Sequence, residues 1–218
     1  MKAYQDVSLA PARRAKALLE EMTLAEKVGQ LNQRLYGFRI YERKCVNGED
    51  TIELSEEFCQ EVEKYSGLGV LYGLYRADPW ADKDYETGLT GVLSKKAYNQ
   101  VQRYVLEHSR LGIPVMMSSE CPHGHQALDG YLLPVNLLAG ATFDPAMVRA
   151  AYRVSGRQLQ NMGVDFALMS MLDVLRDPRW GRSEECYSED PYLSARMAEA
   201  AVIGMQESGP EVVAKHFA

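Results

Sequence analysis

The feature of this sequence that most constrains its fold is a repeated alternation between helical patterns and short apolar runs. Apolar runs of strand length separated by helices are typical of βα units, in which successive strands pair in parallel. The alternation therefore predicts an α/β protein. The predicted strands cover residues 70–74, 113–118, 166–174 and 212–217.

Local signals mark a helix start and a turn in the first quarter of the chain. Thr23 and Glu26 have the spacing of a capping box, which predicts a helix from there to about Arg34. Asn47-Gly48 is the strongest short-range signal for a hairpin turn and predicts two antiparallel strands within residues 39–54.

The later strands are separated by predicted helices, one over residues 94–110 and two more that begin at Asp144 and Asp190. At both aspartates an N-cap residue precedes a proline at the first helical position. Four strands joined in this way predict an incomplete (β/α)8 TIM-type barrel, since a whole barrel needs about 250 residues. A doubly wound open sheet is the alternative, and the lack of a glycine-rich phosphate loop after any predicted strand weakens it.

The charge pattern excludes some classes of partner. The 30 acidic residues exceed the 24 basic ones, and the two signs are interspersed. A nucleic-acid partner is therefore not expected, because it would require a basic stripe. No apolar run approaches the length of a membrane span. Residues 1–9 are polar and lack an apolar signal core, which predicts a cytoplasmic location.

The cysteines do not form a metal-binding or disulfide motif. They are widely spaced, and no Cys-x-x-Cys pair is present. Four reduced thiols are expected in a cytoplasmic protein. These are Cys45, Cys59, Cys121 and Cys186.

Polar side chains follow three of the predicted strands, where a barrel collects its active-site residues. Glu120 comes soon after the strand 113–118, and a charged segment, 176–185, follows the next strand. Lys215 and His216 interrupt the last apolar run. Burying a polar or charged side chain without a partner costs about several kcal/mol of transfer free energy. They are expected either to donate hydrogen bonds in a polar pocket or to lie at an exposed strand end.

Other residues near the strand ends also allow two interpretations. Residues 179–182, Arg-Trp-Gly-Arg, combine guanidinium groups with an aromatic face that suits a sugar, or they form a solvated loop. Glu120 either accepts hydrogen bonds from substrate hydroxyls or pairs with a neighbour. His123 and His125 could bind a divalent metal, although a structural hydrogen-bonding pair is more common. The loop 76–91 is a solvated connection or a lip over the site.

Four blocks, in order, resemble the family 3 glycoside hydrolases (β-glucosidase-like), in the N-terminal part of their barrel domain. The third block is the most distinctive, with the pattern Arg-Asp-Pro-Arg-Trp-Gly-Arg-x-Glu-Glu within it. Together the blocks cover residues 22–31, 110–124, 173–191 and 215–217. The resemblance implies that residues 1–218 are the N-terminal portion of this barrel domain, with the remaining strands and a second domain outside the chain.

The resemblance implies a retaining, exo-acting β-glycosidase that releases terminal non-reducing β-linked glucose or xylose without a cofactor or metal. It places the nucleophile Asp and the acid/base Glu beyond Ala218, so the chain is expected to hold no catalytic residue and to be inactive alone. It assigns sugar binding to Glu120, Arg182, Lys215 and His216. Many relatives carry an arginine a few residues after the first carboxylate, where His125 and Gln126 stand here.

Two other functions remain open on the sequence. One is a metal-dependent hydrolase barrel that uses His123 and His125, and the other is a non-catalytic, sugar-binding remnant. The predicted partner is a small saccharide or glycoside, with neither a nucleic acid nor a membrane. An incomplete barrel also has two open sheet edges, which predict self-association.

Overall fold

The computed structural model of the chain describes residues 2–216, so Phe217, at the end of the last predicted strand, lies outside them. Within that range a two-stranded antiparallel sheet and a four-stranded parallel sheet are present. The strands are β1 (Tyr41–Val46), β2 (Glu49–Leu54), β3 (Val70–Tyr72), β4 (Met116–Glu120), β5 (Phe166–Met171) and β6 (Glu211–Lys215).

The parallel sheet has the order β3-β4-β5-β6, which is the order along the chain. Each strand thus pairs with the next after a helical crossover, as in the wall of a (β/α)8 barrel. The α/β class and the parallel sheet are confirmed. The helices are α1 (Pro11–Glu21), α2 (Leu24–Gln30), α3 (Glu56–Tyr65), α4 (Gly91–Glu107), α5 (Asn136–Gly140), α6 (Pro145–Asn161) and α7 (Pro191–Gln206).

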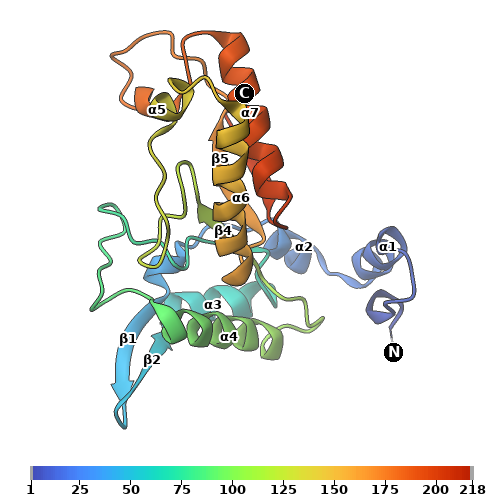
Figure 1. The fold of residues 1–218 in the computed structure, drawn as a ribbon. Helices are drawn as coiled ribbons and strands as arrows, with labels where there is room; N and C mark the ends of the chain where they lie inside the picture. Colours follow the sequence, from blue (N-terminus) through green and yellow to red (C-terminus); the bar gives the residue numbers. More distant parts are fainter. Residues whose placement is uncertain (1, 217–218) are drawn as a thin grey trace.

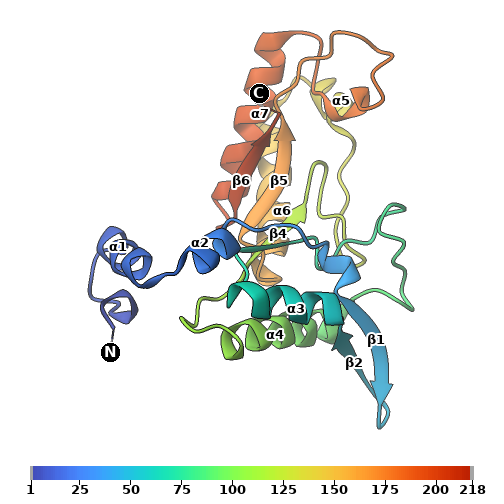
Figure 2. The ribbon, with the colours of Figure 1, turned by 180° about the vertical axis from the view of Figure 1, so that it is seen from behind.

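The helices cover the sheet in two pairs, α6 with α7 and α3 with α4 (Figure 1). Figure 2 shows β4, β5 and β6 in front of α6 and α7, while α1 lies apart from the sheet. The α6–α7 contact requires glycine at position 204, because a Cβ there would lie 2.3 Å from the carbonyl oxygen of Arg149. Leu159 of α6, Met205 of α7 and Met169 of β5 are fully buried and belong to one hydrophobic core.

The predicted capping box at the start of α2 is present. The amide of Thr23 donates to Glu26 Oε2 at 2.7 Å, and Thr23 Oγ1 accepts from the amide of Glu26. The helix ends at Gln30, earlier than the predicted Arg34. The chain leaves the helix there because residues 31–36 run beside β3, where Val70 donates its amide to the carbonyl of Asn32.

The predicted hairpin is also confirmed. β1 and β2 pair from Tyr41 with Leu54 to Val46 with Glu49. Asn47 and Gly48 both have positive φ, 54° and 82°, as a two-residue type I′ turn requires.

The second strand predicted for the parallel sheet begins later than the sequence suggested. The run 113–118 was expected to be the strand, whereas β4 is Met116–Glu120. The side chain of Gln102 pairs with both backbone groups of Val115, so that residue makes no ladder bond before the strand begins. Glu120 is therefore the last residue of β4. No helix within residues 2–216 is long and apolar enough to cross a lipid bilayer.

Candidate functional site

A polar cavity of about 330 Å³ opens at the carboxyl end of the parallel sheet. Its walls come from β4, from the end of β6 and from the loops after β3, β4 and β5. The lining residues are Arg76, Glu120, Pro122, His123, Gln126, Arg182, Glu184, Glu185 and Lys215. Three of the four residues predicted to bind a sugar, Glu120, Arg182 and Lys215, thus share one cavity.

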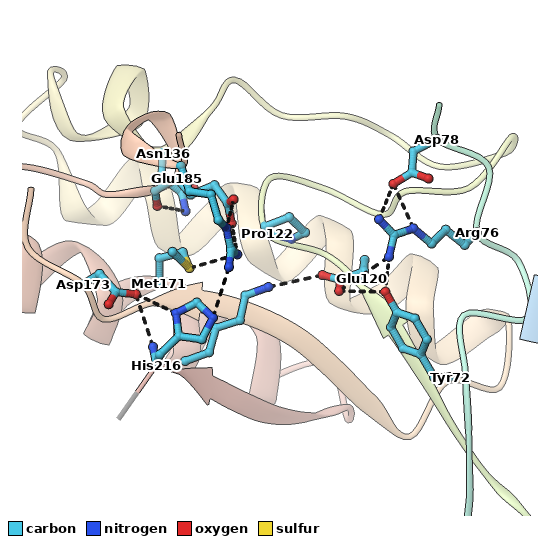
Figure 3. Close-up of polar contacts among 12 residues, drawn as sticks. Tyr72, Arg76, Asp78, Glu120, Pro122, Asn136, Met171, Asp173, Glu185 and His216 are labelled. Atoms are coloured by element: carbon cyan, nitrogen blue, oxygen red, sulfur yellow. Dashed lines mark hydrogen bonds and ion pairs between the residues drawn. The ribbon is translucent and has the colours of Figure 1, made fainter. Parts of the chain in front are cut away.

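Glu120 is the central carboxylate of the cavity, as Figure 3 shows. Its Oε1 accepts a hydrogen bond of 2.9 Å from the Tyr72 hydroxyl, and its Oε2 lies 3.4 Å from Nζ of Lys215. Arg76 is more distant, with its NH1 3.8 Å from Oε1. A carboxylate has about four acceptor positions, so these partners leave Glu120 able to accept from a ligand.

The Lys215 ammonium has the partner that its burial requires. Only 19% of its side chain is exposed, and its charge is balanced by Glu120, which is 15% exposed. The Lys215 side chain therefore lies in a polar pocket and not at an exposed strand end. Two of its three ammonium N–H groups have no partner among residues 2–216. The peptide bond from Lys215 to His216 is cis.

Arg182 makes a two-pronged ion pair with Glu185. Its Nε donates to one carboxylate oxygen at 2.5 Å and its NH2 to the other at 2.7 Å. These hydrogen bonds raise the pKa of Arg182. Burial alone would raise the pKa of Glu185, but pairing with Arg182 leaves that pKa below its ordinary value. Both groups are therefore charged at neutral pH, and the planar guanidinium is held in one orientation.

His216, the fourth predicted residue, lies behind Arg182 rather than in the cavity wall. Its Nδ1 is 2.9 Å from Oδ2 of Asp173, and its Nε2 is 3.2 Å from NH1 of Arg182. With the Nδ1 proton donated to Asp173, Nε2 can accept from Arg182. In this arrangement His216 orients Arg182.

The structure adds residues that the sequence analysis did not single out. Tyr72 ends β3, and Arg76 and Asp78 begin the loop that follows. Arg76 donates to both the Tyr72 hydroxyl and Asp78. The rule that active-site residues follow barrel strands could have identified Arg76, because it comes directly after the predicted strand 70–74.

His123 and His125, the candidate metal pair, lie in different surroundings. His125 is fully buried, its Nε2 lies 2.9 Å from Ser119 Oγ, and burial lowers its pKa to about 4. His123 lines the cavity. Nowhere in the described part of the chain do three or more His, Cys, Asp or Glu side chains form a group that could hold a metal ion. All four cysteines are free thiols.

Comparison with known proteins supplies the family. A model of the glycosyl hydrolase family 3 N-terminal domain matches residues 23–218. This chain belongs to glycosyl hydrolase family 3. Among curated family 3 relatives, a putative β-xylosidase from Formosa agariphila is 31% identical over 100% of this chain and 28% of its own length. A periplasmic β-glucosidase from Salmonella typhimurium is 29% identical over 92% of this chain and 22% of its own length.

Solved structures of family 3 enzymes have the same fold. A β-glucosidase from Erythrobacter marinus superposes with a TM-score of 0.76 and 29% identity over 99% of this chain and 27% of its own. A β-glucosidase from Listeria innocua, solved in complex with glucose, superposes with a TM-score of 0.71 and 26% identity. This match covers 94% of this chain and 26% of the Listeria chain. The expectation of a family 3 barrel domain is thus confirmed. The chain spans about a quarter of the length of these relatives.

The expected cytoplasmic location is contradicted by two relatives. The Salmonella protein is named periplasmic, and so is a β-glucosidase/β-xylosidase from Dickeya chrysanthemi, 27% identical over 93% of this chain. Their names point to a periplasmic rather than a cytoplasmic location. The expectation was wrong because it rested on the polar residues 1–9, which carry no information about the compartment.

Proposed function

We propose that this chain is the sugar-binding part of a retaining, exo-acting β-glycosidase of the β-glucosidase or β-xylosidase type. Its substrate is a terminal, non-reducing β-linked sugar, held by Glu120, Arg182 and Lys215, with His216 orienting Arg182. The nucleophile Asp and the acid/base Glu lie beyond Ala218 in this proposal, and the 218-residue chain alone is inactive.

The observation that carries the proposal is the cavity itself. Side chains that follow three different strands, Glu120 of β4, Arg182 after β5 and Lys215 of β6, line one space of about 330 Å³. Cavities that bind small ligands begin at about 300 Å³, so this one suits a single sugar ring.

The chemistry of the lining supports a polyhydroxylated ligand. A sugar hydroxyl donates one hydrogen bond and accepts others. Glu120 is the acceptor, and the remaining N–H groups of Lys215 and Arg182 are donors. The closed pairs Glu120–Lys215 and Arg182–Glu185 fix these groups before a sugar arrives, which reduces the entropic cost of binding.

The family membership and the relatives support the reaction class. The Formosa and Salmonella relatives are named a putative β-xylosidase and a β-glucosidase. A retaining glycosidase uses a nucleophile and an acid/base carboxyl group about 5–5.5 Å apart. In our proposal neither Glu120 nor Glu185 is such a group, because both are held in ion pairs that serve binding.

The stereochemistry of the reaction tests the proposal. In the longer protein that carries this chain, hydrolysis of an aryl β-glucoside or β-xyloside should first release the β-anomer of the sugar, observed by proton NMR before mutarotation. Arg182→Ala should lower kcat/KM by about 100-fold without changing that anomer, because it removes a charge-assisted contact and not the nucleophile. First release of the α-anomer would show inversion and refute the mechanism.

A further inference from the structure

We propose that Arg76 is a further sugar-binding residue of this cavity and that Arg76 and Glu120 together hold one hydroxyl group of an uncharged sugar. This inference rests on the proposed function. It concerns a residue of the loop 76–91, whose role as a solvated connection or as a lip the sequence left open.

The backbone holds Arg76 beside the loop that follows β4. Arg76 forms an antiparallel bridge with Ala127, and the amide of Ala77 donates to the carbonyl of Gln126 at 3.2 Å. Gly73, just before Arg76, donates its amide to the carbonyl of Ser118 in β4. These bonds fix the first residues of the loop against the strand that ends in Glu120.

The Arg76 side chain is clamped in place. Its Nε donates to Oδ2 of Asp78 at 2.8 Å, NH2 donates to the same oxygen, and NH1 donates to the Tyr72 hydroxyl. The guanidinium carbon lies 4.4 Å from the ring centroid of Trp80, within the range of a cation–π contact. Only 14% of the side chain is exposed. Figure 3 shows the clamp, with Arg76 between Asp78 and Glu120.

The clamp leaves Arg76 with donors that have no partner among the described residues. A guanidinium has five N–H groups, and Asp78 and Tyr72 take three, so two remain. Burial raises the pKa of Tyr72, so its hydroxyl stays protonated and donates to Glu120 while it accepts from Arg76. Arg76 therefore does not depend on Glu120 for its own position.

The spacing between Arg76 and Glu120 fits one bridging hydroxyl. NH1 and Oε1 are 3.8 Å apart, too far for a direct hydrogen bond. The Tyr72 hydroxyl already bridges these two atoms on one side. A second oxygen atom can lie about 2.9 Å from both atoms on the other side, because twice that length exceeds their separation. Such a hydroxyl would accept from Arg76 and donate to Glu120, and both residues line the cavity.

The balance of charge in the cavity indicates an uncharged sugar. Three cationic side chains face three carboxylates, so the lining has no net charge. A uronic acid or a sulfated sugar would add a net negative charge to a lining whose charges are already balanced, which is costly. The six groups are Arg76, Arg182, Lys215, Glu120, Glu184 and Glu185.

A hydroxyl-deletion series tests this inference in the longer protein that carries this chain. Wild type, Arg76→Met and Glu120→Gln are compared on the preferred p-nitrophenyl β-glycoside and on each of its monodeoxy analogues. Arg43→Met is the matched control, because Arg43 also pairs with an aspartate, Asp50 at 2.6 Å, but does not line the cavity. Thermal unfolding of each variant shows whether it is folded.

We expect Arg76→Met to lower kcat/KM on the parent glycoside by about 10- to 100-fold, mainly through KM, the range of one charge-assisted contact. One deoxy analogue should be a poor substrate of the wild type and should show no further loss with Arg76→Met. The loss caused by Glu120→Gln should be smallest on that same analogue, because only the loss that comes through Lys215 remains there. Arg76→Lys should restore part of the activity on the parent, and the aryl β-glucuronide should be at least about 100-fold poorer than the glucoside.

Either of two results with Arg76→Met would overturn its role in sugar binding. One is an unchanged kcat/KM, and the other is an equal reduction of kcat/KM on every analogue, which would show that Arg76 supports only the structure. Efficient hydrolysis of the glucuronide would overturn the assignment to uncharged sugars. If the wild type hydrolyses no aryl β-glycoside, the proposed function itself fails, and that result is distinct from all of these.

Discussion

Lys215 and Glu120 lie 95 residues apart in the sequence, and their side chains form an ion pair with a separation of 3.4 Å. They belong to β6 and β4, which are separated by β5 in the sheet. The pair therefore spans the cavity mouth across three strands. Its position depends on the parallel order of the sheet, so it links the fold directly to the proposed sugar site.

This ion pair predicts energetic coupling between the two residues. Lys215→Ala and Glu120→Gln should each lower kcat/KM of the longer protein on an aryl β-glycoside by about 100-fold, because each leaves a buried group without its partner. The double variant should lose less than the product of the two, with a coupling of about 1–3 kcal/mol. Losses that multiply fully would show that the two residues act independently.

The Glu26–Arg110 pair predicts acid sensitivity. Hydrogen bonds from Arg110 lower the pKa of Glu26 from 4.5 to about 2. A carboxyl whose pKa falls on folding stabilises the protein above pH 4.5, and this contribution is lost as the pH falls toward 2. This contribution is about 1–2 kcal/mol, because Arg110 is half exposed and solvent screens its interaction with Glu26. Urea unfolding measures the drop in unfolding free energy between pH 6 and pH 3, and this drop should be smaller for Glu26→Gln than for the wild type. An equal drop in the two proteins would contradict the assignment.

Buried His125 predicts a second loss of stability at a higher pH. Burial lowers the pKa of His125 from 6.5 to about 4. As the pH falls, this histidine is therefore protonated in the unfolded chain before it is protonated in the folded protein. The folded state is favoured above pH 6.5, and this contribution declines as the pH falls toward 4. His125→Gln, which does not titrate, should flatten the pH dependence of the unfolding free energy between these values. An NMR titration that gave wild-type His125 its ordinary pKa would refute the prediction.

The contact between α6 and α7 predicts that position 204 tolerates only glycine. Gly204→Ala places a Cβ 2.3 Å from the carbonyl oxygen of Arg149, so the two helices must separate. The cost should be about 1–3 kcal/mol, typical of overpacking. Gly181→Ala is the control, because a Cβ there meets nothing within 4 Å. Equal urea midpoints for the two variants would contradict the packing argument.

The exposed edge at β6 predicts self-association of the 218-residue chain. Val213 in β6 is 40% exposed, and Leu172 just beyond β5 is 39% exposed. Unpaired strand edges of this kind pair with other chains unless a charge blocks them. Sedimentation velocity should show an average mass that rises with protein concentration. Val213→Lys should make this rise smaller. A monomer at every concentration would refute the prediction.

Local features of the fold could be predicted because they depend on residues close together in sequence. The turn at Asn47-Gly48 and the helix starts at Thr23, Asp144 and Asp190 are set by backbone conformation and by caps within three residues. The short helix α5 was missed, since five residues carry no helical period.

The candidate site was predictable only in part. Glu120 and Lys215 were found because polar residues interrupt or follow apolar runs. Arg76 could have been singled out as a residue that follows a predicted strand, but its position beside a carboxylate 44 residues later depends on the sheet order and the bridge to Ala127. A periodic pattern carries no such information. That His216 contacts the sugar stays a prediction, and its Nε2 lies 3.2 Å from NH1 of Arg182.

We propose that this chain provides the sugar-binding cavity of a β-glycosidase but not its catalytic carboxyl groups. The most direct measurement compares the 218-residue chain with the longer protein on p-nitrophenyl β-glucoside and β-xyloside, with Lys215→Ala in the longer form. We predict that only the longer protein hydrolyses these glycosides and that Lys215→Ala lowers its kcat/KM by about 100-fold. Turnover by the 218-residue chain, or full activity of Lys215→Ala, would contradict the account.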